Sequence, residues 1–157
     1  MLDSLMIIIA KYFYLVIVFI GFIYIIWRLY NKKNFILWHS IIGMPLSLLV
    51  AKIGSKLFYD PRPFVVKHFV PLVKHAADNG FPSDHALLSF TIASLIFFYN
   101  KKLGIILFIF GLFVGLSRVY VGIHSVIDIL GSFVISVTII YFTKILLSKI
   151  LPKLLDK

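Results

Sequence analysis

The chain contains no cysteine and no glutamate, and aspartate supplies all six of its acidic residues. Without cysteine, disulfide bonds and thiolate chemistry are excluded. Metal-dependent hydrolases usually gather several carboxylates around their ions, and a chain with so few of them is poorly equipped for that chemistry. We therefore expect neither a metal ion nor another cofactor.

Charged residues are also scarce, at 14% of the chain, whereas 61% of the 157 residues are hydrophobic. Soluble domains are nearer to about 45–50% apolar, so this composition indicates a membrane protein. A transmembrane helix usually needs about 17–25 apolar residues. Five apolar stretches cover residues 5–27, 35–58, 84–99, 103–121 and 126–147. Only the third stretch is shorter than the usual range.

We therefore predict an all-α integral membrane protein in which residues 1–157 form a single domain with about five transmembrane helices. Residues 64–75, in the longest polar segment, would add a short interfacial helix. The first apolar stretch is longer than the core of a signal peptide, which has about 7–15 residues, and no small-residue cleavage site follows it. We expect that stretch to be retained as a helix.

The net charge of +10 is distributed unevenly along the chain. Basic residues collect in cytoplasmic loops of membrane proteins. Two basic regions follow the first and third stretches, Arg28, Lys32 and Lys33 and then Lys101 and Lys102, and a third ends the chain with Lys144, Lys149, Lys153 and Lys157. If these regions are cytoplasmic, the N-terminus, the 59–83 loop and the 120–125 turn lie outside. The loop at 59–83 is itself partly basic, and this exception calls for a functional reason.

The segment KLFYDPRPF, residues 56–64, places two basic side chains at the end of the second apolar stretch. Lys56 is typical of a lysine that reaches from a helix end to the membrane surface. Arg62 stands between two prolines that stiffen its backbone. A guanidinium held in this way is well arranged to bind an oxyanion through two hydrogen bonds.

The segment PSDH, residues 82–85, begins the third apolar stretch. Ser83 is a favourable N-cap residue, and Asp84 in the first turn suits the helix dipole. The N–H groups at a helix start bind anions, so His85 would lie within about one turn of a bound anion. The structural alternative is a surface histidine at a helix end.

The segment SRVYVGIHSVID, residues 117–128, joins the fourth and fifth stretches. His124 and Asp128 are four residues apart and would share one face of a helix, so the carboxylate can accept the Nδ1–H of the imidazole. Nε2 would then be free to act as a nucleophile. Arg118 lies at the end of the fourth stretch. The structural alternative is a His–Asp pair that bridges two spans.

Under the topology derived from the basic residues, all three clusters lie at the outer ends of the helices. Ionisable side chains within membrane spans are costly and indicate function. Two arginines, a lysine, a helix start and two histidines together suit a phosphate group. Without a metal, its charge would be neutralised by Arg62, Arg118 and Lys56.

The three clusters resemble the three signature motifs of the type 2 phosphatidic acid phosphatase superfamily, which also contains vanadium haloperoxidases. The third motif (Ser-Arg, five residues, His, three residues, Asp) is complete at residues 117–128. The second reads PSDH, with Asp84 in place of the usual glycine. The first contains Arg62 followed by proline, but Lys56 is one residue too close because position 55 is serine.

Three longer segments, FYDPRPFV, HAADNGFPSDH and SRVYVGIHSVIDILGS, are similar to bacterial undecaprenyl-diphosphate phosphatases of the bacitracin-resistance type, a branch that commonly carries aspartate in the second motif. The motif-bearing core spans about residues 52–131. The resemblance implies a metal-independent hydrolase of the bacterial cytoplasmic membrane, with its active site facing outside, that recycles the lipid carrier of peptidoglycan synthesis. Its partners would be a polyprenyl diphosphate and the bilayer, with no nucleic acid. The oligomeric state stays open.

The same resemblance implies a phosphohistidine mechanism. His124, oriented by Asp128, would attack the terminal phosphorus, and His85 would protonate the leaving lipid phosphate and then activate water. The phosphoryl oxygens would be held by Arg62, Arg118, Lys56 and the backbone near Ser83, with the Ser83 hydroxyl as a further donor. Asp84 would also belong to the substrate-binding residues. Further candidates for substrate contact are Lys52, His75 and Asp78.

Three alternatives remain at this point. The same clusters would serve a phosphatase for phosphatidylglycerol phosphate or phosphatidate. A non-catalytic protein that binds or transports a lipid phosphate would need the cations but no nucleophile. A haloperoxidase would need vanadate and is usually a larger soluble protein.

Overall fold

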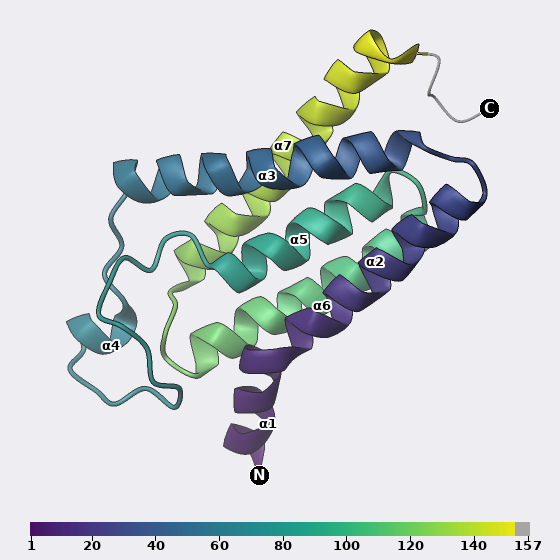
Figure 1. The fold of residues 1–157 in the computed structure, drawn as a ribbon. Coiled ribbons are helices and arrows are strands. Elements are labelled where there is room, and N and C mark those ends of the chain that lie inside the picture. The colour runs from purple at the N-terminus through teal and green to yellow at the C-terminus, as the bar shows by residue number, and fades with distance from the viewer. Residues whose placement is uncertain (153–157) are drawn as a thin grey trace.

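The computed structural model describes residues 1–152, and within them the regular secondary structure is helical. One isolated bridge pairs Pro61 with Asn79. The helices, in chain order, are α1 (Leu2–Ile8), η1 (Ile9–Phe13), α2 (Tyr14–Tyr30), α3 (Phe35–Leu57), α4 (Pro63–Val66), α5 (Asp84–Phe97), α6 (Lys101–Tyr120) and α7 (Val126–Ile150) (Figure 1). Lys153 and Lys157, which were expected to extend the last basic region, lie outside the described residues.

Four helical segments are long and apolar enough to cross a membrane: Leu2–Tyr30, Phe35–Leu57, Lys101–Tyr120 and Val126–Ile150. The first runs unbroken through α1, η1 and α2, and η1 is a single wide turn of π-helix within it. The shorter helix α5, with 14 residues, is the third of the five apolar elements along the chain. The all-α membrane fold expected from the composition is confirmed, including the short third element.

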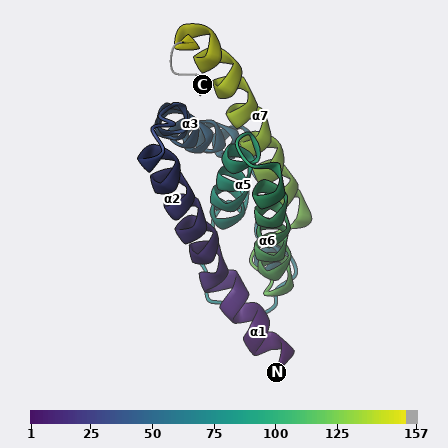
Figure 2. The same cartoon turned by 90° about the vertical axis from the view of Figure 1, so that its right-hand side faces the viewer.

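The short helix α5 lies in the middle of the bundle. It packs against α2, α3, α6 and α7, which surround it in the two views (Figures 1 and 2). Ten of its 14 residues are buried. Because the longer helices enclose it, α5 does not have to span the hydrocarbon layer alone.

Hydroxyl groups tie α5 to α7 along their contact. Thr91 and Ser136 are hydrogen-bonded through their side chains at 2.9 Å, and Ser136 also donates to the carbonyl of Leu87. Ser132 donates to the carbonyl of Ser83 at 3.0 Å. Such bonds between membrane helices hold their relative register. Here they fix the start of α5 beside the start of α7, where two of the predicted clusters lie.

The loop between α3 and α5 contains less helix than expected. Only α4 is helical, and the predicted helix over 64–75 ends at Val66. His68 adopts a positive φ of 53°, a left-handed conformation that a helix cannot contain, and Pro71 follows it. The rest of the loop folds back as turns over the end of the bundle (Figure 1).

Candidate active site

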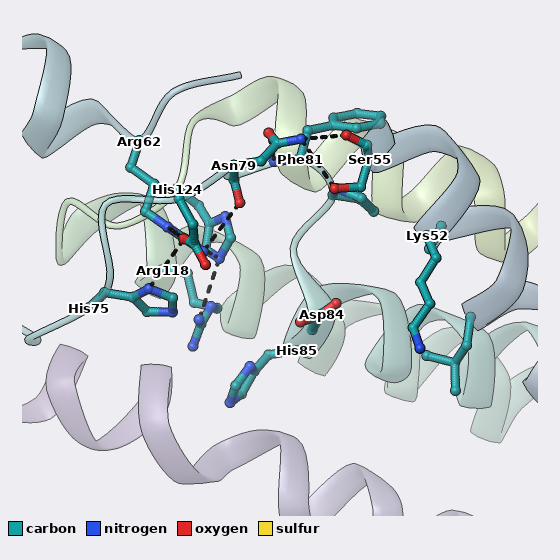
Figure 3. Close-up of a pocket in the computed structure, with 14 residues that line it drawn as sticks. Lys52, Ser55, Arg62, His75, Asn79, Phe81, Asp84, His85, Arg118 and His124 are labelled. Atoms are coloured by element: carbon teal, nitrogen blue, oxygen red, sulfur yellow. Dashed lines mark hydrogen bonds and ion pairs between the residues drawn. The ribbon is translucent and has the colours of Figure 1, made fainter. Parts of the chain in front are cut away.

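A pocket of about 400 Å³ lies at the end of the bundle that the 58–83 loop covers. All three clusters contribute to it (Figure 3). Its lining residues are Leu48, Ala51, Lys52 and Ser55 of α3; Arg62, His75, Asp78, Asn79, Phe81 and Pro82 of the loop; Asp84 and His85 of α5; Arg118 of α6; and His124.

His124 is buried, with 3% of its surface exposed, and its Nδ1 lies 3.0 Å from Oδ2 of the fully buried Asp128. The expected hydrogen bond is therefore present, but the expected reason for it is wrong. His124 precedes α7 and does not share a helix face with Asp128. Ser125 is the N-cap of α7, and its backbone N–H donates to the same Oδ2 at 2.8 Å. A capping box therefore places the carboxylate beneath the imidazole.

The sequence suggested that Nε2, the other ring nitrogen of His124, would be free, but two arginine side chains lie next to it. Nη1 of Arg62 lies 3.3 Å from Nε2, and Nη2 of Arg118 lies 3.4 Å from it. With the Nδ1 proton donated to Asp128, Nε2 carries the lone pair that these guanidinium groups approach. Two cations therefore meet at the atom expected to act as the nucleophile.

Burial lowers the pKa of His124 below 6.5. The hydrogen bond that Nδ1–H donates to Asp128 opposes this shift, and the positive charges of Arg118 and Arg62 add to it. The imidazole is consequently held in its neutral form near neutral pH, which is the form that can attack a phosphorus atom.

Arg62 is 5% exposed, and protein groups fix its guanidinium. Nε donates to Oδ1 of Asp78 at 2.7 Å, and Nη1 donates to the carbonyl of Ile123 at 2.7 Å. The bond from Arg62 lowers the pKa of the Asp78 carboxyl. Asp78 therefore orients the side chain of Arg62. In the sequence, Asp78 was recognisable only as part of a turn and as a weaker candidate for substrate contact.

Arg118 is equally buried, at 5% exposed, and its contacts come from a distant part of the chain. Nη1 donates to the backbone carbonyl of Ala10 in η1 at 3.0 Å, while Nη2 faces His124. The N-terminal helix thus supports Arg118 of α6 through a backbone carbonyl. The sequence had given no reason to expect any part of the N-terminal helix at the site.

The start of α5 lies on the opposite side of the pocket from Arg62 (Figure 3). Ser83 occupies the N-cap position as expected, but its hydroxyl makes no capping bond. That buried oxygen has no hydrogen-bond partner among the described residues, and Ser83 is not one of the pocket's lining residues. His85 and Asp84 line the pocket; His85 is half-buried and Asp84 is exposed.

The lysine expected at the site is not part of the pocket. Lys56 is exposed and does not line it, whereas Lys52, one helical turn earlier, does. Ser55, at the position where the family motif has its lysine, also faces the pocket. Lys52 lies three residues before Ser55 and shares its face of α3, whereas Lys56 directly follows Ser55 and is turned about 100° away from it.

Asn79 is the main structural residue that sequence reasoning missed. Its amide nitrogen donates to the carbonyls of Ser55 and Phe58 at 2.7 and 2.9 Å. Its amide oxygen accepts from the N–H groups of Asp60 and Phe81 at 2.9 and 3.0 Å. The DNG sequence indicated only a turn, whereas the side chain fastens both ends of the loop to α3.

His75 closes the pocket from the loop side. Its ring lies edge-on to that of His124, with 6.3 Å between their centroids. Partial burial and the nearby charge of Arg62 lower the pKa of His75. Among the described residues no group of three or more histidine and acidic side chains is arranged to hold a metal ion.

A helical membrane bundle with a histidine, its carboxylate partner and two converging arginines has the features of a phosphate-handling site. The PAP2 superfamily profile matches residues 36–151. The chain is also 36% identical over 140 residues to a Bacillus subtilis protein named undecaprenyl-diphosphatase BcrC, a match that covers 88% of this chain and 71% of that protein. The chain belongs to the PAP2 superfamily.

Two solved structures share the fold. One is LpxE of Aquifex aeolicus, with a TM-score of 0.69 and 21% identity over 90% of this chain and 93% of that one. The other is a transmembrane PAP2-type phosphatidylglycerolphosphate phosphatase from Bacillus subtilis. It has a TM-score of 0.66 and 26% identity over 95% of this chain and 78% of that one.

Proposed function

We propose that this protein hydrolyses undecaprenyl diphosphate to undecaprenyl phosphate and inorganic phosphate. The observation that carries the proposal is the convergence of Arg62 and Arg118 on Nε2 of a histidine whose Nδ1 is bound to Asp128. A binding protein needs the cations but has no use for an oriented nucleophile between them. The similarity to the Bacillus diphosphatase supports this choice of substrate.

In the first step, Nε2 of His124 attacks the terminal phosphorus, and an N–P bond forms as the P–O bond to the lipid phosphate breaks. His85, across the pocket, gives its proton to the departing oxygen. In the second step, water attacks the phosphohistidine and His85 takes up a proton from it. The N–P bond then breaks, and inorganic phosphate leaves with His124 restored.

The two arginines provide the electrostatic stabilisation. Their buried guanidinium groups are positioned before substrate arrives, by Asp78 and the carbonyl of Ile123 for Arg62 and by the carbonyl of Ala10 for Arg118. A phosphoryl group placed against Nε2 offers both arginines anionic oxygens, which are stronger acceptors than an imidazole nitrogen. Charge that develops on these oxygens in the transition state is then stabilised without reorganisation.

We also propose that the protein lies in the bacterial cytoplasmic membrane with the pocket and N-terminus outside and the C-terminus in the cytoplasm. The basic residues of the described chain support this orientation, since Arg28, Lys32, Lys101 and Lys144 lie at or near the end of the bundle away from the pocket. The bilayer and the polyprenyl diphosphate would be its partners, with no nucleic acid.

The test compares phosphate release from a C55 polyprenyl diphosphate, phosphatidylglycerol phosphate and phosphatidate by the purified protein in detergent, with His124→Ala as the inactive control. We expect the highest kcat/KM for the diphosphate, and no loss of activity in EDTA. Normal turnover by His124→Ala would overturn the phosphohistidine mechanism. Strict dependence on Mg²⁺ would do the same.

The second candidate function is a phosphatase for phosphatidylglycerol phosphate. The shared fold and 26% identity with the Bacillus phosphatidylglycerolphosphate phosphatase favour it. A higher kcat/KM for that glycerolipid in the same comparison would decide for it and against the diphosphate.

A further inference from the structure

The N-terminal helix brings two contacts to the pocket from outside the region that the family profile covers. That region begins at residue 36, whereas α1, η1 and α2 end at Tyr30. Figure 3 shows His85 pointing from α5 toward the purple ribbon of this helix.

The first contact is a backbone one, at the π-helical turn. In a regular α-helix the carbonyl of Ala10 would accept from the N–H of Tyr14. Here the N–H of Tyr14 approaches the carbonyl of Tyr12 instead, and the Ala10 carbonyl accepts from Nη1 of Arg118. The wide turn therefore releases one carbonyl from the helix and directs it to an arginine of the site. Single π-helical turns occur frequently at functional sites.

The second contact comes from the residue that follows this turn. The ring of Tyr14 meets the imidazole of His85 edge-on, with 4.4 Å between centroids and 74° between planes. Within residues 1–152 neither ring nitrogen of His85 has a hydrogen bond to protein, unlike His124. The edge-on contact with the Tyr14 ring therefore restricts the orientation of the His85 ring.

We propose that Tyr14 is a positioning residue that aims His85 at the leaving oxygen, and that the π-helical turn Ile9–Phe13 sets the rotation of the helix so that Tyr14 reaches His85 while Ala10 reaches Arg118. The inference rests on the proposed role of His85 as the proton donor. It gives the first helix a catalytic purpose in addition to membrane anchoring.

Tyr14→Leu removes the ring, whereas Tyr14→Phe retains it. A misaligned catalytic group costs up to about 10²-fold in rate, and for Tyr14→Leu we expect kcat to fall about tenfold with KM changed less than about twofold. Tyr14→Phe should keep the wild-type rate, because the hydroxyl has no hydrogen bond within residues 1–152. Phe19→Leu is the matched control, since Phe19 is an aromatic residue of α2 outside the π-helical turn, with 64% of its surface exposed.

A double-mutant cycle with His85→Ala separates positioning from a general structural effect. If Tyr14 acts through His85, Tyr14→Leu should slow the His85→Ala enzyme by less than about twofold. An equal loss in both backgrounds would overturn the inference and leave the proposed mechanism standing. A full rate for Tyr14→Leu in the wild-type background would also overturn it.

The failure of the mechanism itself would look different. In that case His85→Ala alone would turn over at the wild-type rate, whatever the effect of Tyr14. Should Tyr14→Leu fail to accumulate in the membrane, Tyr14→Met, which keeps a long apolar chain without a ring, enters the same cycle with the same expected losses.

Discussion

Two buried histidines lie at opposite ends of the bundle and differ in what their ring nitrogens do. His39, fully buried in α3, uses both: Nδ1 meets the hydroxyl of Tyr99 and Nε2 meets the carbonyl of Ile140, each at 2.9 Å. His124 uses Nδ1 on Asp128, while its Nε2 faces two arginines and a pocket. Burial alone therefore does not identify a catalytic histidine. The distinguishing features are a nitrogen without a neutral protein partner and space in front of it.

The largest effect should come from removing His124. His124→Ala deletes the proposed nucleophile, and loss of a covalent catalyst costs about 10⁴-fold or more in kcat. The measurement is phosphate release per mole of purified protein, with size-exclusion chromatography in detergent as the control for folding. Residual activity above about 1% of the wild-type level would contradict the role of His124 as the nucleophile and, with it, the proposed difference from His39.

The pH dependence should give the next largest effect. Because the pKa of His124 is lowered from 6.5, its neutral form persists into mildly acidic solution, and the acid limb of kcat/KM should lie below pH 6.5. Burial lowers the pKa of His85 to about 4 in the free protein, so His85 donates a proton near neutral pH only when the bound phosphate raises that pKa. With substrate bound, activity should fall again at higher pH, with limbs of about tenfold per pH unit. A rate that is flat from about pH 5 to 9 would contradict two titrating histidines.

A smaller effect should separate two lysines one turn apart on α3. Lys52 lines the pocket at the end away from Arg62, and Lys56 does not line it (Figure 3). Lys52→Ala should lower kcat/KM for the diphosphate about tenfold, as expected for the loss of one charge-assisted contact, and Lys56→Ala less than about twofold. If both substitutions change kcat/KM equally, the prediction that Lys52 contacts the substrate and Lys56 does not would be wrong.

The smallest effect on activity should come from His39. His39→Phe leaves the partly buried Tyr99 hydroxyl and the buried Ile140 carbonyl without this partner, which costs about 1–3 kcal/mol of stability. We expect kcat within about threefold of the wild type at 25 °C but a lower thermal midpoint in detergent. A loss of activity as large as that of His124→Ala, in a protein that still folds, would mean that the two histidines are not so different.

The sequence was sufficient to predict the five apolar helices and the convergence of the three clusters, but not the extent of the helix in the 59–83 loop. Hydrophobic length and the positions of charges in apolar stretches both have strong physical causes. It was less reliable for side-chain direction. The contact of His124 with Asp128 was predicted from helical spacing, yet a capping box at the start of α7 produces it. The choice between Lys52 and Lys56 depends on the rotation of α3, which packing against α5 and α7 determines.

Two contributions left no signal in the sequence. A tyrosine in an apolar stretch looks the same in the sequence whether its ring is exposed on the outside of the bundle, as that of Tyr12 is, or contacts His85, as that of Tyr14 does. The carbonyl of Ala10 belongs to the backbone, and only the π-helical turn makes it available to Arg118. Both depend on how the first helix is wound and docked, which composition does not specify.

The fastening of the loop by Asn79 also has a consequence for the chemical ageing of the protein. Asn79 precedes Gly80, and an Asn-Gly pair is prone to deamidate when the glycine nitrogen attacks the side-chain amide. In the fold, the N–H of Gly80 is hydrogen-bonded to the carbonyl of Asp60 at 2.8 Å, and four backbone groups hold the Asn79 amide. The attacking geometry is thereby blocked. A mass gain of about 1 Da at this peptide should therefore record the time that a molecule has spent with its loop detached.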